Sequence, residues 1–443
     1  MSGLEQQIKD FMKEQGVAVV GIAGPDRLDG PPSLDPTYTM KGARSIISFA
    51  LPMSVDAIYK FLGKESPAPH GLDQLQGNQR MFRISEFLAG FIRSKGYHAV
   101  AAPPNNVYRR NLDAFATVPS FSHRLGSMAA GISAQGWSGN VMTEEYGAAI
   151  WLDTVMTDAV LKSDKPRYSP RHFIDNYCIK CRTCEKTCVA GMFEPKNEEY
   201  VLLNNELHPR GKRRDINLCN ASCFGLHSLS RDKKWTTWGY HWIDKWIDNP
   251  PDVTRKGEIR LDLFKKGAST GDSTARYDLI RRTASMLWPE DFITEYVQNH
   301  SAIPSEEERM QKFLPYAEKI GVKGIKDDRI LTCGHCAIVC GPTVEESLSR
   351  YHLLAESGLV VLGPGGKMVH ADTYEEAVKI RSQNPLQVTK MEMLKDALAS
   401  AVLFHKYYFG IEPKSIAGGI TYDRKLRKAV KNKIRGFKEN NAN

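Results

Sequence analysis

The sequence predicts a mixed α/β (α+β) protein that carries a separate cysteine-rich module. Two observations support this. Short apolar strands alternate with an amphipathic helix over residues 1–165, and all nine cysteines lie between positions 178 and 340. A chain of 443 residues is longer than one compact core usually requires. We therefore expect one large domain with at least one smaller module.

The first 165 residues give the clearest secondary-structure signals. Residues 17–23 (VAVVGIA) and 44–52 (RSIISFALP) predict buried strands, because each is a short apolar run bounded by turn-forming residues. Between 78 and 96, apolar side chains recur at helical spacing and predict an amphipathic helix. Residues 97–102 (YHAVAA) predict a third strand before two prolines. This alternation is typical of α/β folds.

Tryptophan dominates the long segment that separates the cysteine groups. Four tryptophans recur there at spacings of three and four, which predicts one short helix: Trp235, Trp238, Trp242 and Trp246. We expect this stripe to be core, with an aromatic wall over a substrate cavity as the alternative. After the cysteines, residues 346–362 and 373–410 predict helices around a strand at 359–362.

Composition indicates an ordinary soluble protein, with 42% hydrophobic and 25% charged residues. No apolar run approaches the roughly 18–20 residues that span a bilayer. The N-terminus shows no signal peptide or twin arginine, so we expect a cytoplasmic protein without a transmembrane segment. Part of the net charge of +9 lies in residues 423–438. We expect a solvated basic helix there, with docking of an acidic electron donor as the alternative, and no nucleic acid.

The first cysteine group has the spacing C-x2-C-x2-C-x3-C, formed by Cys178, Cys181, Cys184 and Cys188. This spacing is typical of bacterial two-cluster ferredoxins, in which three thiolates hold one 4Fe–4S cluster and the fourth ligates the other cluster. A disulfide framework would not concentrate the cysteines in this way. Zinc is the alternative, but zinc sites use pairs of cysteine pairs instead of a triplet with a reciprocal fourth ligand.

The second group is C-x2-C-x3-C, formed by Cys333, Cys336 and Cys340, and it lacks a first cysteine of its own. Cys219 or Cys223 can supply that ligand. The implied first cluster is held by Cys178, Cys181, Cys184 and Cys340. The second is held by Cys188, Cys333, Cys336 and one of Cys219 and Cys223. The chain has no G-x-G-x-x-G fingerprint after a strand and no P-loop, so NAD in a Rossmann fold and nucleotide hydrolysis are both disfavoured.

A family resemblance emerges between the first strands and the cysteines. A glycine-rich segment at 130–140, an E-Y-G at 145–147 and a T-D at 157–158 precede the first cysteine group. This order resembles the corrinoid iron–sulfur reductases, namely the reductive dehalogenases and epoxyqueuosine reductase. The resemblance covers about positions 15–345 and is strongest from 123 to 188.

The resemblance implies a nitroreductase-like domain that binds cobalamin and a ferredoxin-like module that reduces it. The domains would be a corrinoid-binding core (1–165), the 4Fe–4S module (166–345) with its Trp-rich insertion (224–332), and a segment completing the corrinoid domain with a basic tail (346–443). Corrinoid contacts would come from Gly136, Trp137, Ser138, Gly139, Asn140 and Tyr146. Cys223 is favoured over Cys219, because Cys223-Phe224 resembles the family's cysteine–aromatic pair.

Three features favour the dehalogenase side. Ala116 stands where epoxyqueuosine reductases carry an aspartate proton donor, no helical-repeat tRNA-binding region is evident, and the insertion is long. The implied reaction is reductive cleavage of a carbon–halogen bond in a small organohalide, with electrons from a donor such as ferredoxin or flavodoxin. The alternatives are an epoxyqueuosine-reductase-like tRNA-modifying enzyme and a non-catalytic electron-transfer ferredoxin subunit.

The proton donor in dehalogenases is a tyrosine with a cationic neighbour. Tyr108 beside Arg109 is the best local match, because a phenol with a pKa of about 10 needs a cation to work at neutral pH. A surface Tyr-Arg-Arg turn is the alternative interpretation. Tyr146 is the second candidate. The arginine that dehalogenases often carry shortly after E-Y-G is replaced here by Ala149 and Trp151.

Overall fold

The core of the protein is a four-stranded antiparallel sheet in the order β1-β2-β6-β3, formed by β1 (Val19–Ala23), β2 (Ser45–Pro52), β6 (Ile150–Thr157) and β3 (Ala99–Ala101). All three pairings are antiparallel, so the fold is α+β within the predicted α/β (α+β) class. The computed structural model describes residues 3–103, 109, 118–170, 177–214, 216–223, 227–239, 242, 334–363 and 368–383.

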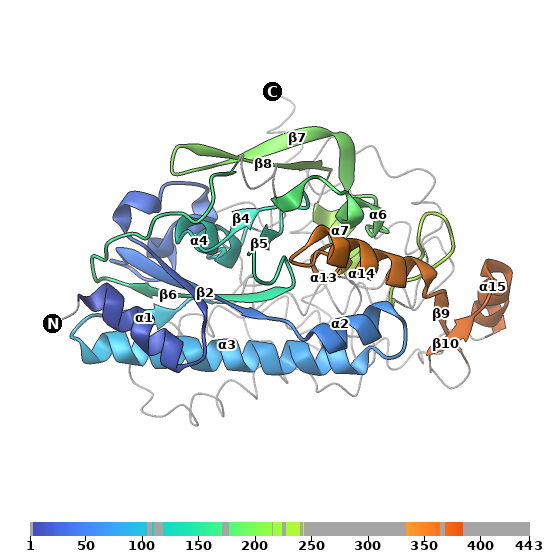
Figure 1. Ribbon diagram of the computed structural model, residues 1–443, viewed down its shortest axis with the longest axis horizontal. Coiled ribbons are helices and arrows are strands. Elements are labelled where there is room, and N and C mark those ends of the chain that lie inside the picture. The colour runs from blue at the N-terminus through green and yellow to red at the C-terminus, as the bar shows by residue number, and fades with distance from the viewer. Residues whose placement is uncertain are drawn as a thin grey trace, which may run out of the picture.

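Helices cover both faces of this sheet, as Figure 1 shows. Alternate residues of a strand point to opposite faces, so the neighbours Ile46 and Ile47 enter different apolar clusters. One cluster packs under α1 (Leu4–Glu14) and α3 (Ala68–Ser94), and the other packs under α4 (His123–Ala129). The sheet is therefore buried on both sides.

A third apolar cluster joins the sheet domain to the cysteine-bearing segments. It brings Phe61 of α2 (Val55–Leu62) together with Trp238, with Val339 after α13 (His335–Ile338), and with Leu354 of α14 (Val344–Glu356). The Trp238 indole donates a hydrogen bond to the Phe61 carbonyl at 2.9 Å. Segments far apart in the sequence thus share one core.

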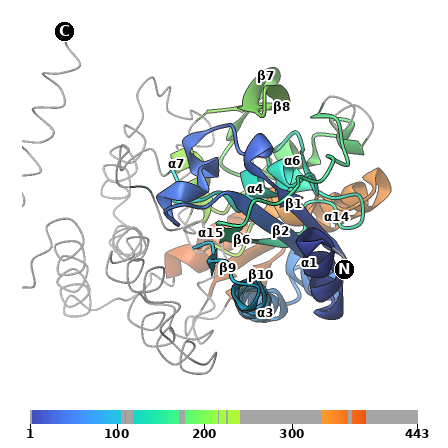
Figure 2. The same ribbon diagram turned by 90° about the vertical axis from the view of Figure 1, so that its left-hand side faces the viewer.

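The hairpin of β7 (Phe193–Leu203) and β8 (Glu206–Arg213) lies above the core sheet and forms the top of the described part of the chain in Figure 2. Asn204 and Asn205 link the two strands with φ values of 51° and 60°, the left-handed geometry of a two-residue hairpin turn. The remaining elements are β4 (Ala134–Gln135), β5 (Val141–Met142), α6 (Thr183–Lys186), α7 (Ile216–Cys223), β9 (Leu359–Leu362), β10 (Met368–Ala371), α15 (Tyr374–Gln383) and 3-10 turns at Pro25–Arg27, Pro32–Leu34 and Pro36–Tyr38.

The predicted strands at 17–23, 44–52 and 97–102 are confirmed, with slightly shorter bounds for each. The predicted helix at 78–96 is present but begins ten residues earlier, at Ala68. Its first turns carry few apolar side chains, so apolar periodicity does not reveal them, whereas Pro69 in the first turn suits a helix start.

The predicted tryptophan helix is wrong for the residues that can be described. Residues 227–239 form turns and an isolated bridge between Leu229 and Thr236, not a helix. The prediction that the stripe is core is confirmed for Trp235, Trp238 and Trp242, which are at most 6% exposed. Trp246, residues 384–410 of the second C-terminal helix and the basic stretch 423–438 lie outside the described residues.

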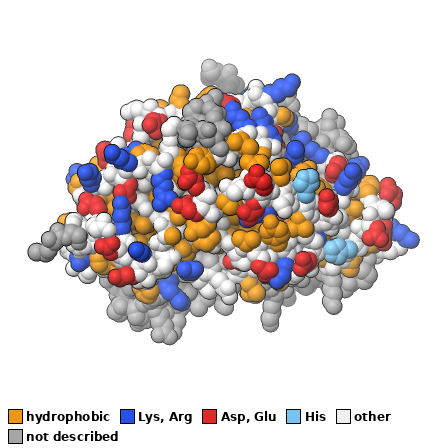
Figure 3. Space-filling view, in the orientation of Figure 1, with side chains coloured by type: hydrophobic (Ala, Val, Ile, Leu, Met, Phe, Trp, Pro, Cys, Tyr) orange, Lys and Arg blue, Asp and Glu red, His pale blue; other side chains and the backbone are white. Residues whose placement is uncertain are grey.

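None of the helices described combines the length and the apolar character needed to cross a membrane. Figure 3 shows basic and acidic side chains mixed across one face of the molecule, with hydrophobic side chains between them.

Candidate metal centre

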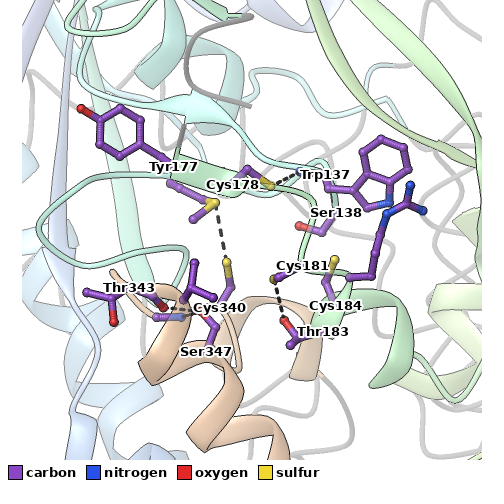
Figure 4. A pocket seen from close by; sticks show the side chains of 14 residues that line it. Trp137, Ser138, Tyr177, Cys178, Cys181, Thr183, Cys184, Cys340, Thr343 and Ser347 are labelled. Carbon is purple, nitrogen blue, oxygen red and sulfur yellow. Dashed lines mark hydrogen bonds between the residues drawn. The ribbon is translucent and has the colours of Figure 1, made fainter. Parts of the chain in front are cut away.

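Four cysteines from the two groups line a single pocket, shown in Figure 4: Cys178, Cys181, Cys184 and Cys340. Trp137, Met142 and Tyr177 also line it, together with Thr343 and Ser347 at the start of α14. These four cysteines are the set that the spacing assigned to the first cluster. The structure thus brings together thiols that lie far apart in the sequence.

Residues with left-handed backbone conformations lie between the first three cysteines and turn the chain so that all three line the pocket. Ile179, Lys180 and Arg182 have φ values of 44°, 52° and 66°. Such a conformation costs a residue with a side chain about 1–2 kcal/mol, so the surroundings must stabilise it. Part of that stabilisation comes from the Trp137 amide, which donates to Cys178 Sγ at 3.2 Å.

Cys340 reaches the same pocket because three contacts fix the backbone around it. The Ala148 amide donates to the Cys340 carbonyl at 2.9 Å. Gly147, with φ of 63°, lies so close that an added Cβ would come within 3.0 Å of the Cys340 and Gly341 backbone. Arg350 of α14 donates from Nη1 to the Ile338 carbonyl at 2.9 Å. The E-Y-G glycine is therefore required where the core meets the second cysteine group.

Burial and mutual proximity raise the pKa values of the Cys184 and Cys340 thiols. For both, burial is the largest cause, and the neighbouring cysteines add to it. Without a cation these thiols stay protonated, whereas bound metal makes thiolate favourable and releases the protons. The pocket therefore has the chemistry of a metal-binding thiol set.

Among the described residues, the four thiols of the pocket do not form a site for a single metal ion. Within the described ranges, no three His, Cys, Asp or Glu side chains form a group fitted to a single metal ion. In a 4Fe–4S cluster each thiolate binds a different iron, so the sulfurs surround a cavity instead of meeting at one point. Four thiols spread around one pocket fit that requirement.

The second set of cysteines is described except for Cys333, which lies outside the described residues. Cys219 and Cys223 occupy successive turns of α7, and their sulfurs are 3.8 Å apart. The Met192 amide donates to Cys188 Sγ at 3.5 Å, and Asn140 Nδ2 donates to Cys336 Sγ at 3.3 Å. Cys219 and Cys223 share one helix face, so the geometry of α7 does not favour either as the cluster ligand. The choice of Cys223 therefore stays a prediction.

Five of the six residues predicted to contact a corrinoid form the stretch 136–140, which contacts cysteines of both sequence groups and lines their pocket. Trp137 binds Cys178 through its amide, Ser138 lines the first pocket, and the Asn140 side chain binds Cys336. All five residues are buried. The contacts that the structure gives this stretch fit iron–sulfur ligands, and we therefore derive no reaction step from a corrinoid bound to it.

The catalytic candidates are placed as follows. Tyr108 lies outside the described residues. Arg109 donates from Nη2 to the Asp35 carbonyl at 2.8 Å and lies 4.3 Å over the Tyr38 ring, and burial lowers its pKa. Tyr146 is partly buried against the core cluster under α4, and its amide donates to Thr143 Oγ1 at 3.2 Å.

Sequence reasoning missed Arg213, the last residue of β8. Its Nη2 donates to the Ser138 carbonyl, and Cys219 and Cys336, when ionised, act to raise its pKa. Burial is the main cause that lowers its pKa, to about 10, so it remains a cation at neutral pH. Its position in the basic run Lys212–Arg214 did not mark it as a site residue in the sequence, because runs of basic residues are usually solvated.

Comparisons with known proteins agree with the resemblance seen in the sequence. The chain is 27% identical over 159 residues to a tetrachloroethene reductive dehalogenase of Desulfitobacterium hafniense, across 36% of this chain and 25% of that protein. It is 24% identical over 168 residues to epoxyqueuosine reductase of Atelocyanobacterium thalassa, across 36% of this chain and 46% of that protein. The chain thus spans a quarter to a half of the curated relatives it matches. No family model matches it.

Solved structures of both kinds are also similar. A catabolic reductive dehalogenase is 15% identical, with a TM-score of 0.37 over 49% of this chain and 28% of the other. An epoxyqueuosine reductase solved with a tRNA stem loop is 14% identical, with a TM-score of 0.33 over 79% of this chain and 98% of the other. The similarity to dehalogenases and epoxyqueuosine reductase that the sequence predicted is confirmed, at low identity.

Proposed function

We propose that this protein is a cobalamin-dependent iron–sulfur reductase of the dehalogenase type. In this proposal it cleaves carbon–halogen bonds in small organohalides, with single electrons from a low-potential donor such as ferredoxin or flavodoxin. The observation that supports it best is the pocket shared by Cys178, Cys181, Cys184 and Cys340. When bound, 4Fe–4S clusters carry electrons at strongly negative potentials, and a corrinoid supplies the bond-breaking chemistry.

The chain's own residues hold the electron-transfer ligands and exclude water from them. Trp137 is 2% exposed and covers the first cysteine pocket, with the Arg182 guanidinium 3.8 Å from its ring centre. Cys178 and Cys184 are buried at 9% and 6% exposure. Low solvent exposure is one of the factors that set cluster potentials. An enclosed site of this kind suits a reductant for demanding substrates.

The second candidate function is that of an epoxyqueuosine-reductase-like tRNA-modifying enzyme, which the relative from Atelocyanobacterium thalassa favours. Ala116 in place of the aspartate donor and the long insertion favour the dehalogenase proposal. Ala116 and most of the insertion lie outside the described residues. Two assays on the reconstituted protein separate them: halide release from organohalides, and conversion of epoxyqueuosine to queuosine in tRNA. A visible spectrum that shows clusters without corrinoid bands, with neither activity, would support an electron-transfer subunit instead.

The cluster assignment is tested by the reciprocal ligation. The anaerobically reconstituted protein should bind close to eight irons and eight sulfides, since two 4Fe–4S clusters are proposed. Cys178→Ser and Cys340→Ser should abolish the same electron paramagnetic resonance (EPR) signal, although they belong to different sequence groups. Cys188→Ser and Cys336→Ser should abolish the other signal. A value near four irons, stoichiometric zinc, or pairing of the losses by sequence group would overturn the assignment.

The fourth ligand of the second cluster is tested in the same way. Cys223→Ser should lose the signal that Cys336→Ser loses, and Cys219→Ser should retain it. The opposite result would make Cys219 the ligand. Both variants alter the same face of α7, so each is the matched control for the other.

The proton donor is tested by two tyrosine variants. Tyr108→Phe should keep the iron and corrinoid content but lose turnover by about 10²–10⁴-fold, which is the usual contribution of a placed general acid. Tyr146→Phe should change turnover much less. Steady-state halide release measures both. A selective loss in Tyr146→Phe would move the role to that residue.

A further inference from the structure

Arg213 lies at the junction of the β8 strand and the 136–140 turn. Its Nη2 donates to the Ser138 carbonyl, and an added Cβ at Gly139, which has φ of 71°, would come within 3.0 Å of the guanidinium. Only glycine at 139 therefore lets the arginine approach this closely. Arg213 Nε has no exposed surface and no hydrogen-bond partner among the described residues.

Arg213 makes no ion pair with a carboxylate in the part of the chain that the structure describes. The neighbouring cations Arg210 and Arg124 are instead close enough to lower its pKa further. A cation that is largely removed from water requires a compensating negative charge. Cys219 and Cys336, as thiolates, act in the opposite direction on the Arg213 pKa, so thiolates that hold a cluster can supply this charge.

The same turn donates directly to one of these sulfurs. Asn140 Nδ2 lies 3.3 Å from Cys336 Sγ, and the Asn140 amide is fixed by Ser138 Oγ at 3.1 Å. Arg213 holds the Ser138 carbonyl, so the arginine and the asparagine are joined through one residue. Hydrogen bonds to cluster sulfurs and nearby net charge are two determinants of a cluster's reduction potential.

We propose that Arg213 and Asn140 together raise the reduction potential of the second cluster, the one assigned to Cys188, Cys333, Cys336 and Cys219 or Cys223. This rests on the iron–sulfur assignment of the proposed function. Reduction adds one electron from the external donor and no proton, so the cluster and its thiolates become more negative by one charge. The guanidinium and the amide hydrogen bond stabilise that reduced state more than the oxidised one. Arg213 and Asn140 are positioning residues that act through the cluster ligands.

The test is an EPR-monitored redox titration of the reconstituted full-length protein. Arg213→Gln should lower the midpoint potential of the signal that Cys336→Ser abolishes, and leave the other signal unchanged. Arg213→Lys keeps the charge and should remain near the wild-type midpoint. Asn140→Leu keeps the size of the side chain but removes the donor, and should lower the same midpoint. Arg214→Gln, at the exposed neighbouring position, is the matched control and should change neither.

Equal midpoints in Arg213→Gln and wild type, or equal shifts in both signals, would overturn this inference while leaving the cluster assignment intact. An equal shift in Arg214→Gln would reduce the effect to general surface charge and would also overturn it. If Arg213→Gln does not assemble the second cluster, Asn140→Leu decides the question by the presence or absence of its selective shift. Failure of the wild-type protein to show two signals would instead refute the proposed function.

Discussion

Gly147→Ala, which adds a single methyl group, should destabilise the protein and displace the backbone that carries Cys340. Two costs arise in Gly147→Ala. The φ of 63° places a residue with a side chain in the left-handed region, at about 1–2 kcal/mol. The new Cβ would also lie within 3.0 Å of backbone atoms of Cys340 and Gly341, which cannot rotate away as a side chain can. Overpacking of this kind costs about 1–3 kcal/mol.

The total expected loss of stability is about 2–5 kcal/mol, the sum of these two effects. The displaced backbone carries Cys340, so the first cluster should also lose occupancy. Thermal unfolding under anaerobic conditions, at one fixed scan rate, measures the stability difference. Iron content and the EPR signal shared with Cys178→Ser measure the cluster.

Gly42→Ala is the matched control. Gly42 has φ of 84°, and nothing lies within 4 Å of an added Cβ. This variant should therefore lose only the conformational cost of about 1–2 kcal/mol, with full iron content. Equal destabilisation of the two variants, with eight irons retained in both, would show that the close approach of Gly147 to Cys340 does not hold the pocket.

Three further outcomes are expected. Lys64 is fully buried, and burial lowers its pKa to about 7, below its value in the unfolded chain. Stability is therefore lost as the pH falls from about 10.5 towards 7. Lys64→Met should increase the free energy of unfolding at neutral pH by about 1–4 kcal/mol and raise the thermal midpoint, whereas Lys60→Met at the exposed ion pair should change either little. Burial also lowers the pKa of His70 to about 4. Wild-type stability should therefore fall as the pH drops from about 6.5 towards 4, by up to about 1.4 kcal/mol per pH unit. Thermal unfolding of His70→Gln over the same pH range tests this, and an unchanged acid dependence would contradict it. Arg350→Met removes a charge-assisted hydrogen bond to the Ile338 carbonyl, whose loss should cost about 1.5–3 kcal/mol of stability. Iron content and the thermal midpoint should fall together. An unchanged iron content would show that Arg350 of α14 does not position Cys340.

The sequence predicted those parts of the molecule whose pattern is local. The strands at 17–23 and 44–52 are apolar runs with clear ends, and they are strands in the structure. The spacing of the cysteines implied that Cys340 joins the first group, and the structure places it in the same pocket. Ligand spacing is informative because a cubane constrains consecutive thiolates within a few residues of each other.

Contacts set by tertiary packing could not be predicted in this way. Trp235 and Trp238 recur at a helical spacing, yet the Trp235 amide bonds the Ser230 side chain at 3.1 Å in a turn. Apolar character predicted their burial correctly, but it does not determine where the backbone hydrogen bonds go. The pairing of Asn140 with Cys336 joins residues 196 positions apart, and no local pattern marks either partner for the other.

The return of Cys340 to the first pocket has a consequence for the chain between the two cysteine groups. Residues 189–332 lie between Cys188 and Cys333, which we assign to the second cluster, so a bound cluster would close this stretch as a covalent crosslink does. Closing a flexible loop costs only about 0.6 kcal/mol more for each doubling of its length. Within this stretch the proposed ligands Cys219 and Cys223, Arg213 and the core tryptophan Trp238 must keep their places, so a change of length beyond Trp242 should disturb the proposed cluster ligands least. In the proposed function, substrate preference could then change through this part of the chain while the cluster ligands stay the same.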